Sequence, residues 1–188
     1  MAKIYELQPD IFSNYVPSVV EKLNESIYFR GGNIIIEPIP LPLIFTSRHS
    51  SKELPSGFHG RCIPLMSDEL IESLKKIGVS NLQCFPAEIR SSVDRSIWTN
   101  YQAVNVIGKI SCADFTSSKF THIMDRPESD DLPLVAFENL KVNPNCTRDA
   151  LLFRLAESPG VILIAEKVAN YLLSIHSEQD WGITLDER

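Results

Sequence analysis

The feature that most constrains the fold is an amphipathic helix whose two ends are both marked in the sequence. Ser67 is suited to cap the N-terminus, because its hydroxyl can accept a hydrogen bond from a free N–H of the first turn. Acidic residues follow Ser67 and two lysines precede Gly78, so each charge balances the helix dipole at its own end. Gly78 can take the left-handed conformation that ends a helix. The face expected to be buried consists of Leu70, Ile71, Leu74 and Ile77.

Short apolar segments on both sides of this helix predict strands. We expect strands at 33–36, 81–89, 98–110, 132–142, 151–155, 161–164 and 181–185, and a second helix at 166–175. Ser158-Pro159-Gly160 predicts a turn, and 46–60 and 116–131 predict loops. The sequence therefore predicts an α+β fold, with a mixed or antiparallel sheet and a few packed helices.

Residues 62–85 and 161–185 share the order strand, helix, turn, strand. Their residue identity is slight. The common strand–helix–strand arrangement of α+β proteins therefore explains the likeness more simply than an internal duplication, which stays an alternative.

The N-terminal third differs in character from the rest of the chain. Residues 1–60 are predicted to form an N-terminal segment or small lobe, with a short helix at 17–23, and residues 61–188 the main domain. Three prolines at 37–42 cannot donate ladder hydrogen bonds, so this stretch is expected to be an extended edge or a linker. The apolar residues between the prolines favour packing on the core over recognition as a polyproline ligand.

Charge and hydropathy limit the function classes. The net charge of −6 argues against non-specific binding to nucleic acid or anionic membrane, which needs clustered lysine and arginine. It suits a basic partner, and equally the solubility of an ordinary cytoplasmic protein. The sequence has neither a recognisable secretory signal nor the ~18 apolar residues of a membrane helix, so we expect a cytoplasmic protein.

Motifs of catalysis and cofactor binding are not recognisable. The four histidines form no metal-binding pair, the four cysteines form no CxxC pair, and no nucleotide-binding loop or nucleophile elbow occurs. We therefore predict no catalytic residue, no cofactor and no metal, and expect free, buried thiols. Catalytic groups can also be assembled from distant positions, so a hydrolase using His59 or His122 with a carboxylate stays an alternative.

Several segments together resemble a bacterial family. They are "PLMSDELIESLKKIGVSNLQCFPAEI" (64–89), "YQAVNVIGKISCADF" (101–115), "LLFRLAESPGVILIAEKVANYLLSI" (151–175) and "WGITLDE" (181–187). This pattern of core positions and turns over about 60–188 is similar to the eleventh immunity class of polymorphic toxin systems. Ala165-Glu166 departs from it, where a serine-type helix start is expected.

The resemblance implies a cytoplasmic antidote that binds and neutralises a cognate toxin encoded nearby, in some cases a nuclease, without catalysis. A nuclease site is basic because it holds phosphates, so an acidic inhibitor suits it. Residues 157–188 carry six acidic against two basic side chains. The hypothesis for the toxin-facing surface is therefore Glu128, Asp130, Asp131, Glu178, Asp180, Asp186 and Glu187, against the alternative of ordinary solvated loops and ends. A self-associating structural or regulatory module is the second function class.

Overall fold

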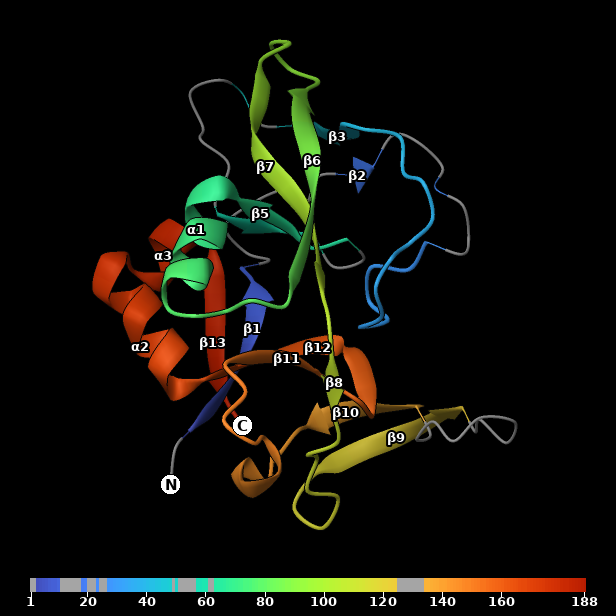
Figure 1. Ribbon diagram of the computed structural model, residues 1–188, viewed down its shortest axis with the longest axis vertical. Helices are drawn as coiled ribbons and strands as arrows, with labels where there is room; N and C mark the ends of the chain where they lie inside the picture. The colour runs from blue at the N-terminus through green and yellow to red at the C-terminus, as the bar shows by residue number, and fades with distance from the viewer. Residues whose placement is uncertain are drawn as a thin grey trace.

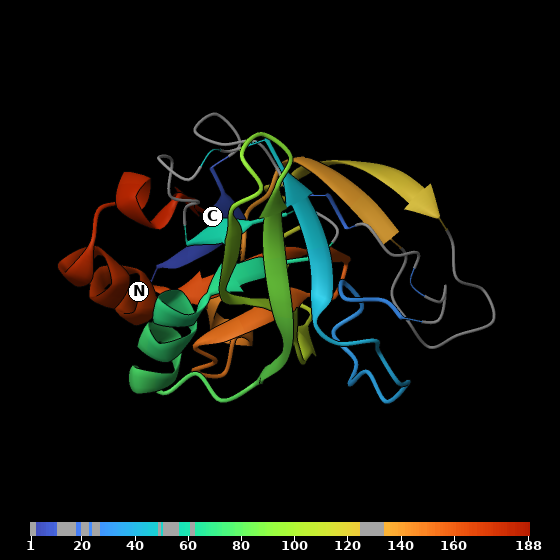
Figure 2. The same ribbon diagram turned by 90° about the horizontal axis from the view of Figure 1, so that it is seen from above.

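The computed structural model describes residues 3–10, 18–19, 23, 27–48, 50, 57–60, 63–124 and 134–188. In these residues two large β-sheets and a two-stranded ribbon lie beside three helices (Figure 1). This confirms the predicted α+β class with mixed and antiparallel sheets. All three helices lie on one side of the molecule (Figure 2). None of the helices in these residues is long and apolar enough to cross a membrane.

The six-stranded sheet has its strands in the order β2-β3-β6-β7-β5-β4. Their bounds are β2 Ser18–Val19, β3 Leu43–Ser47, β6 Leu82–Ser91, β7 Ile97–Val106, β5 Leu65–Ser67 and β4 Phe58–His59. β3 and β6 are parallel and the other pairs antiparallel, so the sheet is mixed.

The five-stranded sheet has the order β13-β1-β12-β11-β8. Its strands are β13 Ile183–Glu187, β1 Ile4–Pro9, β12 Ser158–Ala165, β11 Leu152–Leu155 and β8 Lys109–Ile110. β9 Lys119–Met124 and β10 Leu134–Asn139 form a separate antiparallel ribbon. The helices are α1 Asp68–Lys76, α2 Glu166–Ile175 and α3 Glu178–Trp181, with a 3-10 turn at Pro144–Cys146.

The first 60 residues contribute to both sheets. β1 lies between β12 and β13 and pairs antiparallel with each, while β3 pairs with β6. β12 and β13 are connected in the chain through α2 and α3, and β1 lies between these two strands in the sheet. The same arrangement recurs in the other sheet, where β7 lies between β5 and β6 and α1 connects them. The two segments that share a sequence order therefore also share a topology.

Three apolar clusters form the core. The largest fills the space between the two sheets and the helices, and includes Leu70 and Leu74 of α1 with Val168 and Leu172 of α2. A second cluster covers the other face of the six-stranded sheet with Phe29 and Ile35. The third joins β11 and β12 to Leu140 and Val142. Alternating residues of one strand reach two clusters: Met66 reaches the first and Leu65 the second.

Both predicted long helices are confirmed. The Ser67 hydroxyl accepts from the Leu70 N–H at 3.2 Å, and α1 buries Leu70, Ile71 and Leu74. Gly78 has φ +106° just after this helix. α2 begins after Ala165, whose side chain makes no capping bond. It buries Val168, Ala169 and Leu172, whereas Ile175 is 39% exposed.

The strand predicted at 33–36 is wrong, and a side chain provides the reason. The Gln83 carboxamide of β6 accepts from the Ile35 N–H at 2.9 Å and donates to the Ile35 carbonyl at 2.7 Å. Asn105 of β7 donates to the Asn33 carbonyl at 2.7 Å. Amide side chains therefore take the place of a neighbouring strand, and the segment lies on the sheet without joining it.

Four further predictions in loops and turns are wrong. Ser18–Val19 is a strand rather than part of a helix at 17–23, of which Leu23 is the only other described residue. The predicted loops contain β4 and β9. The turn lies at Ala156–Glu157, and β12 begins at Ser158. Pro159 is tolerated in this strand because β1 pairs with β12 only at Leu163–Ala165, so no β1 ladder bond is lost at the proline.

The C-terminal strand begins later than predicted. Trp181 ends α3, because its ring is buried and its Nε1 donates to the Leu172 carbonyl at 2.9 Å. Gly182, at φ +63°, then turns the chain into β13. The strand predicted at 98–110 is interrupted at Ile107-Gly108, where Gly108 has φ +97°.

A fully buried arginine connects the two sheets. Arg154 of β11 is 1% exposed. Its guanidinium donates to the Val106 carbonyl at 3.1 Å, the Pro159 carbonyl at 2.7 Å and the Phe29 carbonyl at 2.7 Å. These acceptors belong to β7, to β12 and to the segment that covers the six-stranded sheet. One side chain therefore satisfies backbone groups from three parts of the chain.

Replacing this arginine by a residue of similar length tests its role. Arg154→Met leaves three buried carbonyls without their donors, so we expect a loss of about 3–5 kcal/mol in the free energy of unfolding, measured by urea titration. Arg90→Met is the control, because Arg90 is half-exposed and among the described residues pairs with Glu88 alone, and should cost less than about 0.5 kcal/mol. Equal losses in the two variants would contradict the role assigned to Arg154.

Candidate interaction surface

The exposed side of α1 carries carboxylates at its N-terminal end. Glu69 and Glu72 are one turn apart and exposed, opposite the buried Leu70 and Leu74. Asp68 is half-buried and accepts from the Gln102 Nε2 of β7 at 2.7 Å. The helix is therefore held by its cap and core face, while its two glutamates point away from the core.

α3 presents a third carboxylate through a capping box. The Ser177 hydroxyl accepts from the Asp180 N–H at 3.2 Å, and the Asp180 carboxylate accepts from the Ser177 hydroxyl at 2.6 Å and from the Ser177 N–H. These hydrogen bonds lower the pKa of Asp180 below its usual value. Asp180 is therefore an exposed carboxylate whose position is fixed by the capping box.

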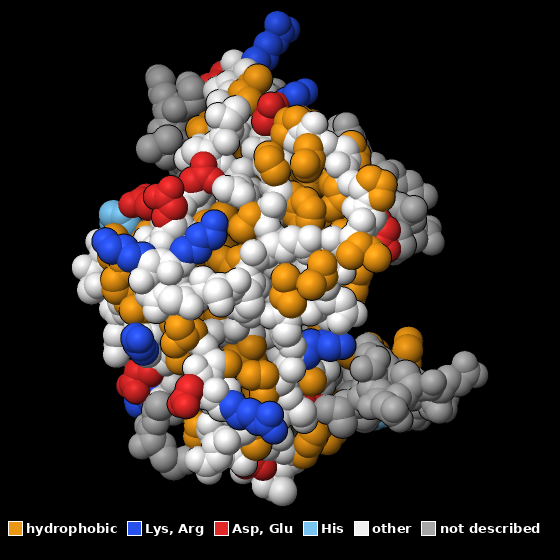
Figure 3. All heavy atoms as spheres, in the orientation of Figure 1, with side chains coloured by type: hydrophobic (Ala, Val, Ile, Leu, Met, Phe, Trp, Pro, Cys, Tyr) orange, Lys and Arg blue, Asp and Glu red, His pale blue; other side chains and the backbone are white. Residues whose placement is uncertain are grey.

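His176 brings α1 and α3 together. It caps the end of α2, its Nε2 lies 2.9 Å from Glu69 Oε1, and its ring packs edge-on against Trp181 at 4.8 Å between centroids. The side chains of both His176 and Glu69 are well exposed, so their contact contributes little stability. Figure 3 shows acidic side chains gathered over α1 beside a histidine. We call Glu69, Glu72 and Asp180 the α1–α3 acidic face.

The other C-terminal residues of the predicted surface have structural partners. Glu178 accepts from the Leu185 N–H at 3.0 Å and thereby ties α3 to β13. Glu187 pairs with Lys3 at 2.7 Å, and Asp186 lies 3.3 Å from an Arg188 nitrogen. The structure therefore places Glu69 in contact with His176 and Asp180 within the electrostatic reach of His176, whereas Asp186 and Glu187 lie in β13 among neutralising cations.

The predicted acidic loop has no structural description. Glu128, Asp130 and Asp131 lie outside the described residues. Glu69 and Glu72 are not among the residues predicted for the toxin-facing surface. The spacing that buries Leu70 and Leu74 implies an exposed opposite side of this helix, which is the signal that could have found them.

The histidines and cysteines are dispersed. His59 is buried beside Tyr101 in the six-stranded sheet, whereas His122 is exposed on the β9–β10 ribbon. His49 and Cys62 lie outside the described residues. Cys84, Cys112 and Cys146 are free, and burial raises the pKa of Cys112 to about 12. Within the described ranges no three His, Cys, Asp or Glu side chains are grouped to hold a metal ion.

Comparison of the chain with protein-family models and with curated proteins gives no match.

The ion pair between Glu6 and Arg188, which also contacts Asp186, makes the stability of the fold depend on pH. Burial raises the pKa of Glu6 above its ordinary value of 4.5 and outweighs the attraction of Arg188, whose Nε donates to Glu6 at 2.8 Å. The folded state therefore binds this proton more tightly than the unfolded state. The protonated Glu6 thus adds to the free energy of unfolding below pH 4.5. This contribution is lost as the pH rises through the raised pKa of the folded state.

We predict that Glu6→Gln flattens the pH profile of stability just above pH 4.5, measured as urea midpoints at successive pH values. Glu88→Gln is the control, because Glu88 forms a comparable arginine pair at the surface. A profile that Glu6→Gln leaves as steep as that of the wild type would contradict the assignment.

Proposed function

We propose that the protein is a binding protein that acts by occupying a surface of another protein. More particularly, we propose that it is a cytoplasmic antidote, which binds the toxin encoded beside it and blocks it without chemistry. The α1–α3 acidic face is the observation that carries this proposal. The resemblance of residues 60–188 to the toxin-immunity class supports it independently.

The chemistry of the face suits a basic partner. Asp180 is exposed and its carboxylate is oriented by the capping box, and Glu69 and Glu72 are exposed on a helix fixed by core packing. Complementary charge accelerates association, and helix-borne carboxylates lose little conformational freedom on binding. A toxin that acts on nucleic acid exposes basic groups for phosphate, so a nuclease is the toxin class that fits this face best.

Self-association is the second candidate function, favoured by the β9–β10 ribbon. All six residues of β9 are exposed, and among the described strands it pairs only with β10. Ile123 and Met124 are 60% and 55% exposed. An apolar strand with an open edge is a template for pairing with another chain, including a second copy.

The first test is co-purification of the tagged protein with the product of the adjacent gene, together with growth assays. We expect a stable complex, growth arrest when that product is expressed alone, and rescue on co-expression. The untagged adjacent product passed over the same resin is the control. A homo-oligomer in sedimentation, with neither complex nor rescue, would contradict the antidote and favour self-association.

Charge neutralisation then locates the surface. In the variant Glu69→Gln/Glu72→Gln we expect association with the toxin to slow by roughly 3- to 10-fold at low salt, measured by stopped-flow, with little change at high salt. Glu187→Gln is the matched control, because Glu187 is already paired with Lys3. A control effect as large as that of the double variant would rule out the α1–α3 acidic face as the contact.

A further inference from the structure

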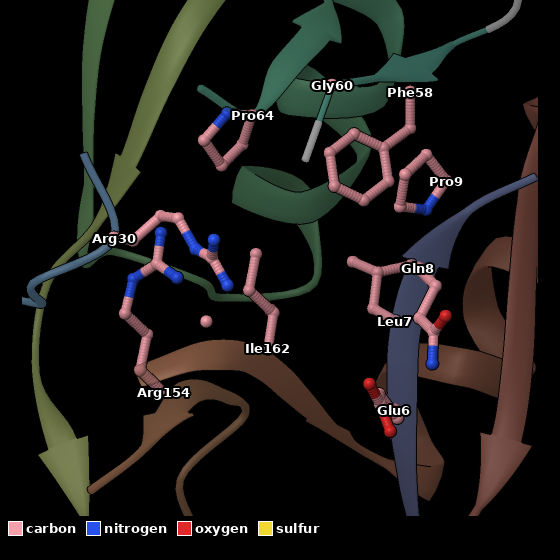
Figure 4. A pocket seen from close by; sticks show the side chains of 11 residues that line it. Glu6, Leu7, Gln8, Pro9, Arg30, Phe58, Gly60, Pro64, Arg154 and Ile162 are labelled. Carbon is pink, nitrogen blue, oxygen red and sulfur yellow. The ribbon is translucent and has the colours of Figure 1, made fainter. Parts of the chain in front are cut away.

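A cavity of about 330 Å³ lies between the two sheets, away from the α1–α3 acidic face. Its walls come from β1, from β4 and the segment after it, from β12, and from two arginines (Figure 4). Arg30 and Arg154 project their guanidinium groups side by side on one wall. Phe58 and Pro9 lie on the opposite side. The volume is at the lower end of the ~300–1,000 Å³ of small-molecule sites.

The two guanidinium groups have no carboxylate partner in the part of the chain that the structure describes. Each positive charge disfavours the other, and burial together with Arg30 lowers the pKa of Arg154 to about 10. Among the described residues neither arginine forms an ion pair, and Glu6 on the far wall is paired with Arg188. Two adjacent cations in a partly buried cavity are costly unless an anion joins them.

Their roles in the cavity differ. Arg154 uses three donors on backbone carbonyls, which fixes its position. Arg30 is half-buried, and its Nε is buried without a hydrogen-bond partner. A Cβ at Gly160 would lie 1.9 Å from an Arg30 nitrogen, so only glycine lets this guanidinium lie against β12. The Arg30 side chain is therefore positioned by its fit against Gly160, and its Nε has no hydrogen-bond partner.

Apolar side chains supply much of the remaining wall. Leu7 and Phe58 are 2% exposed and Ile162 is 4% exposed, and Pro9 and Pro64 lie beside them, while Glu6 and Gln8 of β1 add polar groups. We propose that this cavity binds a carboxylate attached to a small apolar body, with Arg30 as the anion-binding side chain and Arg154 as its fixed support. A planar guanidinium can bind a carboxylate through two parallel hydrogen bonds. This site is independent of the proposed toxin contact.

One ligand chemistry here has two sources: a free organic acid, or the C-terminal carboxylate of a polypeptide. The probes are 3-phenylpropionate and the tripeptide acetyl-Ala-Ala-Phe, each compared with its neutral amide by isothermal titration against the full chain. We expect each acid to bind at least about tenfold more tightly than its amide. Tighter binding of the peptide would identify the ligand as the C-terminus of a polypeptide. Tighter binding of phenylpropionate would identify it as a free organic acid.

Arg30→Gln is the decisive variant, because Arg30 makes no hydrogen bond within the described residues and its loss relieves the repulsion on Arg154. We expect the variant to unfold at the wild-type temperature or above, and to bind the acids about tenfold more weakly. Arg90→Gln, which removes an exposed arginine, should bind like the wild type. Equal affinity for acid and amide, unchanged binding in a folded Arg30→Gln, or no binding at about 10 mM would overturn the proposal. Inorganic phosphate binding as tightly as the acids would overturn the role of the apolar wall.

Discussion

The arrangement of the two sheets depends on the guanidinium group of Arg154. An arginine offers five donors in a rigid plane, and here three of them reach carbonyls of β7, of β12 and of the segment at Phe29. The backbone reinforces this junction, because the Arg154 N–H donates to Gly108 and the Gly108 N–H donates to Gly32. Gly32 itself lies close to Lys109 and Arg154, where a Cβ would be crowded. At this junction, small residues and one long donor therefore take the place of apolar packing.

The two sheets also share a larger core built by two similar units. In each, the strands before and after a helix flank a third strand, and the helices bury their apolar sides in one cluster. The central strand differs in origin: β7 follows its unit in the chain, whereas β1 comes from the N-terminus. Residues 4–9 are consequently as integral to the core as the C-terminal strand beside them.

The two candidate sites carry opposite charge and arise in different ways. Two members of the α1–α3 acidic face arise from helix ends, since Glu69 in the first turn of α1 balances the dipole and Asp180 closes a capping box, while Glu72 lies on the exposed side of α1. The arginine cavity is a consequence of the sheet junction, where the same side chain that holds the fold also sets a positive potential. An acidic surface toward a basic protein and a basic cavity toward a small acid can therefore coexist in a chain of net charge −6.

The sequence by itself determined the elements whose signals are local. The Ser67 cap, the apolar spacing of α1 and α2, and the α+β class are all predicted correctly, because a capping hydroxyl and a 3.6-residue period act within a few residues. Only the tertiary structure decided what depends on distant partners. Gln83 keeps 33–36 out of the sheet, His176 contacts both Glu69 of α1 and Trp181 of α3, and Arg30 meets Arg154 across 124 positions of the chain. These contacts are set by how sheets pack, and packing leaves no periodic signature in the sequence.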